Sequence, residues 1–552
     1  MAIRPMRPQD AAWYHMDGPV NLAMVTGVVL TKTPLDFEKV KAVYKERLLQ
    51  FEVFRQRVVE RGFPVALPHW EDMPNFDIDQ HIHHVALPEP HDDKALADFV
   101  SDIASTPLDR ERPLWQIHIV DDVNGGSALV MRYHHCIADG TAMNAVTRAM
   151  YDTEPDAPHR KPAAKRTQPE RAGVDKVFAP ALEGIERSAR RALATAAAAV
   201  EAASHPQQLL DKAALVLDGA GMLVKELLKT PDPASPLKGK FGLAKRVAWS
   251  EPVALGDIKA IGAAHGAKVN DVLVAGMTGA LRTYLKRRGA DVDEMTLRAT
   301  VPVDLRDPAR AGELGNSFGL VILELAIGSK GPWERLRATK ANMDALKRSP
   351  EAVAIMALFE IFGRTPKLVE DLAVYLFGTK ASLVMTNVAG SPQQLYLAGV
   401  PIDRIMFWVP HPGNQLGMGI SILSYAGSVS LGVVSDAHLV PDPEVIAREF
   451  NREFAAMLNK VNGKSASAAA SSTKVRQAPA TKAATVPAKR AARRAKAGAA
   501  KKVAAKAAVK RATPIKAAKA AKAATAAKGR VAAKPKAAVK KAPKKAAKRR
   551  AR

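Results

Sequence analysis

The chain has 552 residues, a single cysteine and a formal net charge of +27. One cysteine excludes an internal disulfide framework and fits a reducing compartment, and no apolar run reaches the roughly 18 residues of a membrane-spanning helix. The charge is uneven: residues 464–552 hold 29 Lys and Arg and no acidic residue, which leaves 53 basic against 55 acidic residues before them. We therefore expect a nearly neutral part of two or three domains and a polycationic tail.

Residues 1–153 alternate short apolar runs with helical spacing, which indicates an α/β domain. Strands are predicted over 20–30 and 127–136, and helices around 37–49 and 95–104. After residue 140 the apolar residues again recur with helical spacing. The stretch between the second strand and this last helix is therefore predicted to be a loop held by a rigid scaffold.

That loop carries two adjacent histidines followed by Asp-Gly, in His134-His135-Cys136-Ile137-Ala138-Asp139-Gly140. Such a pattern arises by accident in about one chain of this composition in a thousand. Side chains alternate along a strand, so we expect His134 to share a face with Arg132, and His135 to share the other face with Tyr133.

The motif suggests acyl transfer from a thioester to a hydroxyl group. A hydroxyl is a weak nucleophile, so a base with a pKa near the working pH must take its proton, and His135 suits that role. The thiolate that leaves has a pKa of about 8.5 and can take the proton back. Backbone amides or an Asn side chain would stabilise the oxyanion. Asp139 is expected to orient a histidine or hold the loop through a salt bridge, and Gly140 to permit a close turn.

Other interpretations of these residues stay open. The paired histidines, His134 and His135, could be strand-end residues with satisfied hydrogen bonds. Cys136 beside a histidine could be a nucleophile, but it occupies a variable position of the motif and alternates away from His135, which favours a small buried residue. A metal site is a further possibility at four histidines, but no Cys or carboxylate cluster stands nearby; these are His81, His83, His84 and His91.

Residues 154–245 are expected to connect two domains. The segment 154–172 is rich in Pro and charge, which is typical of a linker. Ala-rich helical sequence follows over 174–228, including an amphipathic stretch at 209–228 that could bind a lipid surface or simply pack on the core.

A second α/β pattern covers residues 246–463, and it is comparable in size with the first. Helices are predicted over 256–265 and 271–288. Strands are predicted over 296–303, 320–325, 383–386 and 428–434. Asn270 lies just before the second of these helices, where Asn is also a preferred N-cap residue.

The motifs in their order resemble the bacterial wax ester synthase/acyl-CoA:diacylglycerol acyltransferase family, within the superfamily that shares the His-His…Asp-Gly motif. The resemblance covers about 460 residues and is carried by Met16-Asp17-Gly18, Pro113-Leu114-Trp115, His134 to Gly140, Ser235 to Gly239, Val269 to Val272, Leu314 to Gly319, Thr386 to Gly390 and Ser424 to Gly427.

The resemblance implies two chloramphenicol-acetyltransferase-like α/β domains with the active site between them. It implies His135 as general base, Asp139 as the residue that fixes the loop, and Asn270 as a contribution from the second domain to the site or its geometry. Acyl-CoA would be the donor and co-substrate, and diacylglycerol or a long-chain alcohol the acceptor, in a ternary complex without an acyl-enzyme. No metal or prosthetic group is expected.

Residues 464–552 repeat Ala-Lys units without any aromatic residue, so we expect this tail to be disordered. It resembles the tails of histone H1-like bacterial proteins. Such a segment would bind nucleic acid or anionic lipid by counterion release, or it would be an extension without a partner.

The sequence therefore predicts an O-acyltransferase that makes triacylglycerol and also wax ester. Two alternatives remain: a related acyltransferase with another hydroxyl acceptor, and an inactive acyltransferase-like body that binds nucleic acid or lipid inclusions. Residues 1–10 lack the apolar core of a secretory signal. We expect a cytoplasmic protein, bound peripherally to the inner membrane or to lipid inclusions.

Overall fold

The computed structural model describes residues 3–20, 22–60, 67–157, 230–306, 314–347, 374–375, 378–411 and 415–474. The Ala-rich connector predicted over 174–228, its amphipathic stretch at 209–228, nearly all of the predicted linker and the tail beyond residue 474 lie outside the described residues. No helix among the described residues is both long and apolar enough to cross a membrane.

The first of two large sheets holds six strands in the order β13-β14-β2-β7-β6-β5. All neighbours in it are antiparallel except β5 and β6, which are joined through helix α3 and run parallel. Its strands are β2 (Met24–Thr31), β5 (Ile82–Ala86), β6 (Trp115–Val123), β7 (Gly126–His134), β13 (Tyr396–Leu397) and β14 (Val400–Trp408). A small sheet, β1-β4-β3, accompanies it and consists of β1 (Ile3–Pro5), β3 (Gln56–Val59) and β4 (His69–Asp72).

The second large sheet has the order β11-β10-β12-β15-β16-β8, with β9 also paired to β16. The strand β12 runs parallel to both of its neighbours, and the other pairs are antiparallel. Its strands are β8 (Lys245–Trp249), β9 (Val253–Ala254), β10 (Leu297–Asp304), β11 (Phe318–Leu325), β12 (Leu383–Ala389), β15 (Met418–Tyr425) and β16 (Ser428–Asp436).

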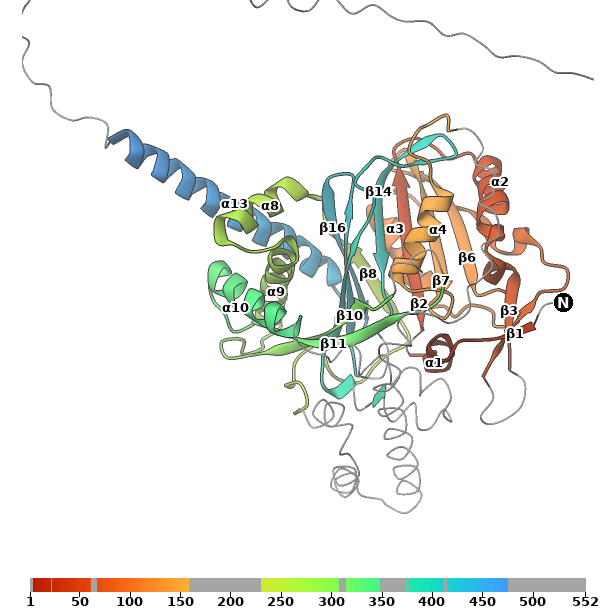
Figure 1. The fold of residues 1–552 in the computed structure, drawn as a ribbon, viewed down its shortest axis with the longest axis horizontal. Coiled ribbons are helices and arrows are strands. Elements are labelled where there is room, and N and C mark those ends of the chain that lie inside the picture. The colour runs from red at the N-terminus through yellow and green to blue at the C-terminus, as the bar shows by residue number, and fades with distance from the viewer. Residues whose placement is uncertain are drawn as a thin grey trace, which may run out of the picture. The chain divides into compact units, whose positions relative to one another are not determined.

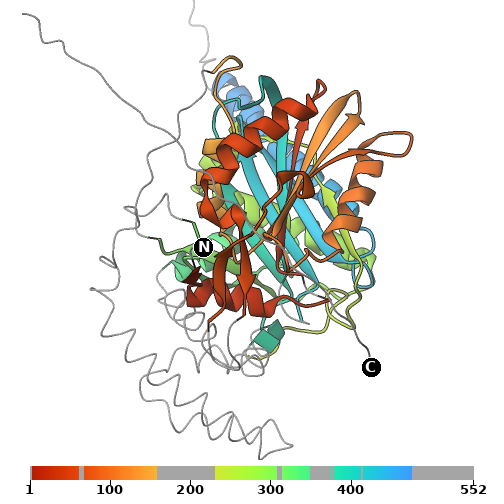
Figure 2. The same cartoon turned by 90° about the vertical axis from the view of Figure 1, so that its right-hand side faces the viewer.

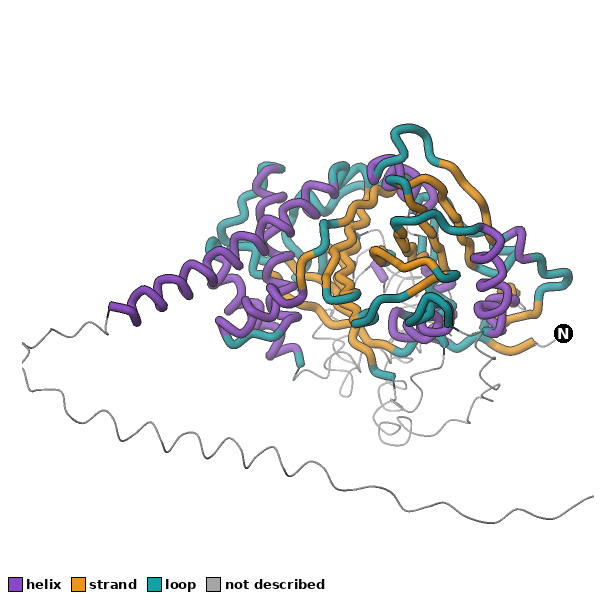
Figure 3. The backbone as a smooth tube through the Cα atoms, turned by 90° about the horizontal axis from the view of Figure 1, so that it is seen from above, coloured by secondary structure: helices purple, strands orange, loops and turns teal. Residues whose placement is uncertain are grey.

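Helices cover both sheets, and Figure 3 shows strands in the middle with helices on either side. Four helices of the second half pack against one another on its sheet (Figure 1). The helices are α1 (Pro8–Met16), α2 (Phe37–Arg47), α3 (Asp93–Ala104), α4 (Gly140–Met150), α8 (Leu255–His265), α9 (Val269–Arg287), α10 (Pro332–Leu346) and α13 (Pro443–Lys474), with short 3-10 turns at Leu48–Gln50, Glu52–Arg55 and Ile78–Gln80.

Helix α13 changes one predicted boundary. The sequence places the end of the second domain at residue 463 and the start of a disordered tail at 464, but the helix continues to Lys474. Ala and Lys are good helix formers, so the first Ala-rich part of the tail extends a helix that begins in the core.

The first sheet includes strands from the second half of the chain, which the sequence did not indicate. Strand β14 belongs to the second half of the chain, yet it pairs with β2 of the first sheet, with Met406 opposite Val28. In Figure 2 the teal strands of the second half stand beside the red and orange strands of the first. The predicted division at residues 153 and 246 therefore does not separate the sheets, because residues 396–408 return to the first one.

Close packing joins the two sheets where β14 meets β8, β15 and β16. The indole Nε1 of Trp408 donates to the carbonyl of Ala248 at 3.0 Å. Gly432 has no room for a side chain, since a Cβ there would lie 2.5 Å from the carbonyl oxygen of Phe407. The buried cluster between the sheets mixes both halves, with Val28 and Val130 from the first and Val434 from the second.

The free edge of β8 is closed by side chains of the first half. The hydroxyls of Ser101 and Ser105, in and just after α3, accept from the backbone N–H groups of Val247 and Lys245 at 3.1 and 2.8 Å. Unpaired strand edges invite pairing with other chains. Here two hydroxyls remove that hazard and fix the first half against the second.

A buried ion pair lies at the same junction. The ammonium of Lys245 is 3.2 Å from a carboxylate oxygen of Asp436, and it also donates to the carbonyl of Val20 at 2.7 Å. Both side chains are almost fully buried. A buried charge left without its partner is costly, so this contact should matter more than any exposed pair.

We expect Lys245→Met to lower the free energy of unfolding by about 3–5 kcal/mol, because it leaves Asp436 buried without its counter-charge. The matched control is Lys94→Met, which breaks the exposed Lys94–Asp98 pair and should cost at most about 1 kcal/mol. Urea denaturation of both variants measures the difference. Equal losses would mean that the buried pair stabilises the protein no more than an exposed pair does.

Candidate active site

The end of β7 sends its two histidines to opposite faces, as predicted. His135 lines a cavity together with Tyr133. His134 points the other way, where its Nε2 is 3.8 Å from Asp17. Burial alone would raise the pKa of Asp17, but His134, the Ala23 N–H and other donors outweigh it and hold that pKa at about 2. His134 therefore makes a buried structural contact with Asp17, on the side of β7 that faces away from the cavity.

The imidazole of His135 is fixed on its edge and on its face. Its Nδ1 is 2.9 Å from Oδ1 of Asn316, and the indole of Trp13 stacks on it with ring centres 3.9 Å apart. Only 8% of His135 is exposed. Burial lowers its pKa to about 4, against the opposing influence of Asp139 and Asn316. The ring is therefore neutral at pH 7, as a proton acceptor must be, but its pKa is lower than the value near the working pH that the sequence leads us to expect of the base.

Asn316 reaches His135 from the second half of the chain. Its segment approaches the loop through a parallel bridge between Gly315 and Ala138. Gly315 has a φ of +102°, a conformation that disfavours any side chain, and a Cβ there would also displace the Arg7 guanidinium from the space that it occupies. This explains the Gly-Asn pair in residues 314–319, a segment that carries part of the family resemblance.

The predicted role of Asp139 as a loop anchor agrees with its contacts. Its Oδ1 accepts from the N–H of Ala142 at 2.8 Å and caps α4. Its Oδ2 accepts from Arg306 at 2.7 Å and from the N–H of Ser317 at 2.8 Å. Asp139 therefore joins the catalytic loop to the second half, and its described hydrogen bonds do not include a histidine.

Gly140 does not make the close turn that we expected from the sequence. It is the first residue of α4 and has no positive φ, and a Cβ would make an ordinary contact with Val388 at 3.5 Å. The turn is instead set by the Asp139 cap. Gly140 lines the cavity and leaves space there.

Asn270 lies beside the site rather than in it. It is exposed and occupies the second position of α9, whose N-cap is Lys268. Its Oδ1 accepts from Nδ2 of Asn387 at 2.8 Å, and Asn387 lines the cavity. The neighbouring Asp271 accepts from the Lys268 N–H at 2.9 Å. Asn270 can therefore act on the site through Asn387, and it lies two positions after the observed N-cap, Lys268.

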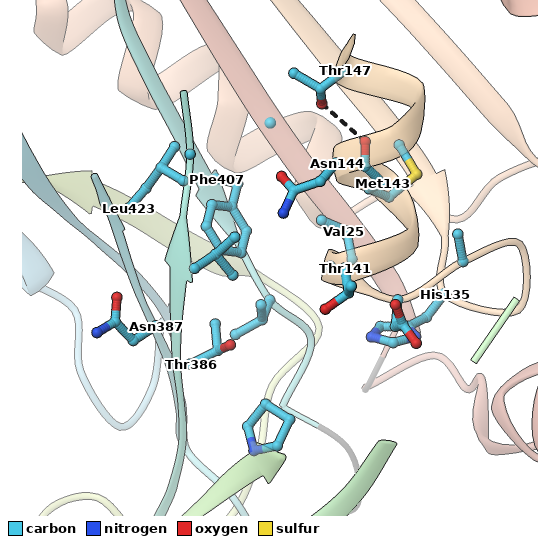
Figure 4. A pocket seen from close by; sticks show the side chains of 18 of the residues that line it. Val25, His135, Thr141, Met143, Asn144, Thr147, Thr386, Asn387, Phe407 and Leu423 are labelled. Carbon is cyan, nitrogen blue, oxygen red and sulfur yellow. Dashed lines mark hydrogen bonds between the residues drawn. The ribbon is translucent and has the colours of Figure 1, made fainter. Parts of the chain in front are cut away.

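The cavity measures about 680 Å³ and lies between the two sheets, within the ~300–1,000 Å³ usual for small-molecule sites. Strands β2, β7 and β14 form one wall, strands β10, β11 and β12 another, and α4 runs along it. Most lining side chains are apolar. Figure 4 shows His135 at one side, with Asn144 on α4 and Thr386 and Asn387 across the space.

The cysteine and the histidines that the sequence offered for other chemistry make structural contacts. Cys136 is fully buried, and burial raises the pKa of its thiol well above the ordinary value, which does not suit a nucleophile. His81 donates from Nδ1 to the Trp115 carbonyl, and His84 and His91 contact Asp121 and Asp122. Among the residues that the structure describes, no group of three or more His, Cys, Asp or Glu could hold a metal ion.

Family comparison agrees with this arrangement. The family models of the wax ester synthase/diacylglycerol acyltransferase catalytic domain and of its C-terminal domain match residues 6–273 and 314–458. The chain belongs to this family. It is therefore an acyltransferase, and the α/β acyltransferase fold predicted from the sequence is confirmed.

Relatives and solved structures of this type cover most of the chain. A probable diacylglycerol O-acyltransferase of Mycobacterium tuberculosis is 27% identical over 442 residues, which is 78% of this chain and 90% of that protein. A second one from the same species is 28% identical over 457 residues, or 79% and 94%.

Two solved structures share the fold. The wax ester synthase/diacylglycerol acyltransferase of Marinobacter aquaeolei VT8 matches with a TM-score of 0.57 and 23% identity, over 83% of this chain and 99% of that one. The starter condensation domain of rhizomide synthetase matches with a TM-score of 0.51 and 12% identity, over 83% and 94%.

We expect Asp139→Asn to lower both the melting temperature and the rate of acyl transfer. Asn still caps a helix well, but its Nδ2 would face two donors, Arg306 and the Ser317 N–H, and would leave the Arg306 charge buried without its partner. Thermal unfolding and steady-state kinetics measure the two effects. A loss of rate without any loss of stability would instead assign Asp139 a direct part in the chemistry.

Proposed function

We propose that this acyltransferase moves a long-chain acyl group from acyl-CoA to diacylglycerol, with long-chain alcohols as a second class of acceptor. The observation that carries the proposal is His135: a neutral, oriented imidazole in the wall of a mainly apolar cavity between two sheets. The names of its mycobacterial relatives favour diacylglycerol, and that of the Marinobacter structure adds wax ester synthesis.

The reaction follows from one proton acceptor and two bound substrates. The Nε2 of His135 takes the proton of the acceptor hydroxyl while its oxygen attacks the thioester carbonyl. The tetrahedral intermediate then collapses, the carbon–sulfur bond breaks, and the CoA thiolate takes the proton from the imidazolium. The products are an ester and CoA thiol. The proposal needs no acyl-enzyme, metal or prosthetic group.

Two other functions were left open by the sequence. An acceptor of another class, such as a polyketide or glycolipid hydroxyl, would use the same chemistry. The mainly apolar lining favours acceptors without a bulky polar group, such as diacylglycerol and long-chain alcohols. An inactive body that serves for binding would not need an oriented, neutral histidine. The contacts of His135 therefore favour an active enzyme.

We expect His135→Ala to reduce thiol release by about 10²–10⁴-fold, because no other group replaces the base. The assay incubates the purified protein with palmitoyl-CoA and either diacylglycerol or hexadecanol. The matched control is His84→Ala, which removes a histidine that does not line the cavity and should keep the rate. Undiminished thiol release by His135→Ala would overturn the base assignment, and failure of both acceptors with the unmodified protein would favour another hydroxyl substrate.

We further propose that the enzyme is cytoplasmic and binds the inner membrane or lipid inclusions peripherally, and that its basic tail holds it at DNA, RNA or anionic lipid. The support is compositional: 29 basic residues and no acidic one after residue 463. Each Lys or Arg near an anionic surface adds about 1 kcal/mol. The tail would thereby decide where the reaction takes place.

We expect deletion of residues 475–552 to abolish binding to DNA and to phosphatidylserine vesicles at low salt, since it removes most of the positive charge but keeps α13 whole. Acyl transfer to dispersed substrates should be unchanged. Filter binding and vesicle flotation at low and high salt measure the effect, because such binding weakens steeply with salt. Equal binding by the deleted and full chains would exclude the tether.

A further inference from the structure

Asn316 is the hub of a buried hydrogen-bond network that ends on His135. Its Nδ2 lies 2.8 Å from Oδ1 of Asp10 and 2.8 Å from the carbonyl oxygen of His135. Its backbone N–H donates to the same Asp10 oxygen at 2.8 Å. Its Oδ1 lies 2.9 Å from Nδ1 of the His135 ring. Asn316 and Asp10 are both nearly inaccessible to solvent.

The chemistry of these partners allows only one orientation of the amide. A carbonyl oxygen can only accept, and Oδ1 of Asp10 already accepts from a backbone N–H, so both atoms require a donor from the Asn316 side chain. The NH₂ group must face them. The amide oxygen must then face His135, and since it can only accept, the proton of the neutral imidazole has to be on Nδ1.

We propose that Asp10 and Asn316 are positioning residues that hold His135 in the tautomer protonated at Nδ1, which leaves the lone pair of Nε2 for the acceptor hydroxyl. This inference rests on the proposed role of His135 as the base. Neither residue touches the reacting atoms: Asp10 acts on Asn316, and Asn316 acts on the ring.

An amide is the side chain that position 316 requires. A carboxylate there would also accept from Nδ1 of His135, but it would face the Asp10 oxygen and the His135 carbonyl with no proton to donate. An alkyl side chain would remove the Asn316 acceptor from Nδ1 and would restrict the tautomer of the ring less. Asn alone supplies two donors on one side and an acceptor on the other.

The network is anchored by α1, which also supplies the stacking ring. Asp10 is held by Arg7, whose Nε lies 3.1 Å from Oδ2 and whose guanidinium also donates to the carbonyl of Leu314. One turn further on, Trp13 lies flat on His135. A single helix thus fixes the edge of the imidazole through Asp10 and its plane through Trp13.

The charged and titratable groups around the ring do not change this assignment. Asp139 acts on it through charge and is itself paired with Arg306, while His134 is the neighbouring residue on β7. Asp10, which contacts Asn316, is itself paired with Arg7, and the cavity wall that holds His135 also carries Arg148 and Asp304. Asn316 hydrogen-bonds Nδ1 of the ring, and the backbone of His135 itself also contacts the imidazole. A carbonyl can only accept, so this second contact is compatible with a proton on the ring nitrogen.

The first test uses the unmodified protein and does not depend on its activity. Long-range ¹H–¹⁵N spectra of ¹⁵N-histidine-labelled protein at pH 7 report which ring nitrogen carries the proton, and a His135→Gln sample assigns the signal. We expect His135 to be protonated at Nδ1. A signal protonated at Nε2 would overturn the proposal, whatever the enzyme is found to transfer.

The second test compares variants along the network. We expect Asn316→Ala to lower kcat at least about 10-fold with little change in the KM for palmitoyl-CoA, and to mix the two tautomers in the spectrum. Asp10→Ala should have a similar effect, and Asp10→Asn, which keeps an oxygen toward Asn316, should recover most of the loss. In the Asn316→Ala background, Asp10→Ala should lower kcat little further, because Asp10 acts on the ring through Asn316 and that residue is already replaced.

These outcomes separate the proposal from the role of His135 itself. If His135→Ala is inactive but Asn316→Ala keeps its kcat and a pure Nδ1 tautomer, the base assignment stands and the positioning role is wrong. If the losses from Asp10→Ala and Asn316→Ala simply add, Asp10 does not act through Asn316. If Asn316→Ala does not fold, the tautomer of the unmodified protein and the comparison of Asp10→Asn with Asp10→Ala decide.

Discussion

The carboxylate of Asp139 connects the catalytic loop to helix α4 and to the second half of the chain. One oxygen caps α4 through Ala142, and the other binds Arg306 and the N–H of Ser317. Ser317 is the neighbour of Asn316, so the same carboxylate sets the position of the residue that reaches His135. The start of a helix, the contact between the two halves and the partner of the imidazole all depend on this one group.

The cavity depends on strand β14, which the second half of the chain contributes to the first sheet. Strand β14 comes from the second half of the chain but lines the wall that β2 and β7 form in the first sheet. The opposite wall belongs to β10, β11 and β12. Neither half contains a complete binding site. A mainly apolar space that both halves enclose suits substrates with long hydrocarbon chains, and it excludes water from a base whose pKa is already lowered by burial.

Local patterns in the sequence were enough to predict the catalytic loop and the strand that precedes it. The alternation of β7 placed His134 and His135 on opposite faces, and the change to helical spacing placed Asp139 at the start of α4. The rest depends on contacts between distant residues. Asn316 lies 181 positions from His135, and Asp10 lies 306 positions from Asn316. No local sequence pattern around any of these three residues indicates that it contacts the other two. The same holds for β14, whose partner is decided by tertiary packing, and for Asn270, whose neighbour Asn387 is known only once β12 and α9 are placed.

The pairing of β14 with β2 also has a consequence for the synthesis of the chain. Strand β2 is among the first elements to leave the ribosome, but its partner β14 follows more than 350 residues later. At about 5–20 residues per second, the edge of β2 waits on the order of 20–70 s for its neighbour. During that time an apolar strand edge is open to other nascent chains. The native first sheet is therefore a late event in synthesis, and the early half of the chain depends on the surroundings that shelter it until the return strand arrives.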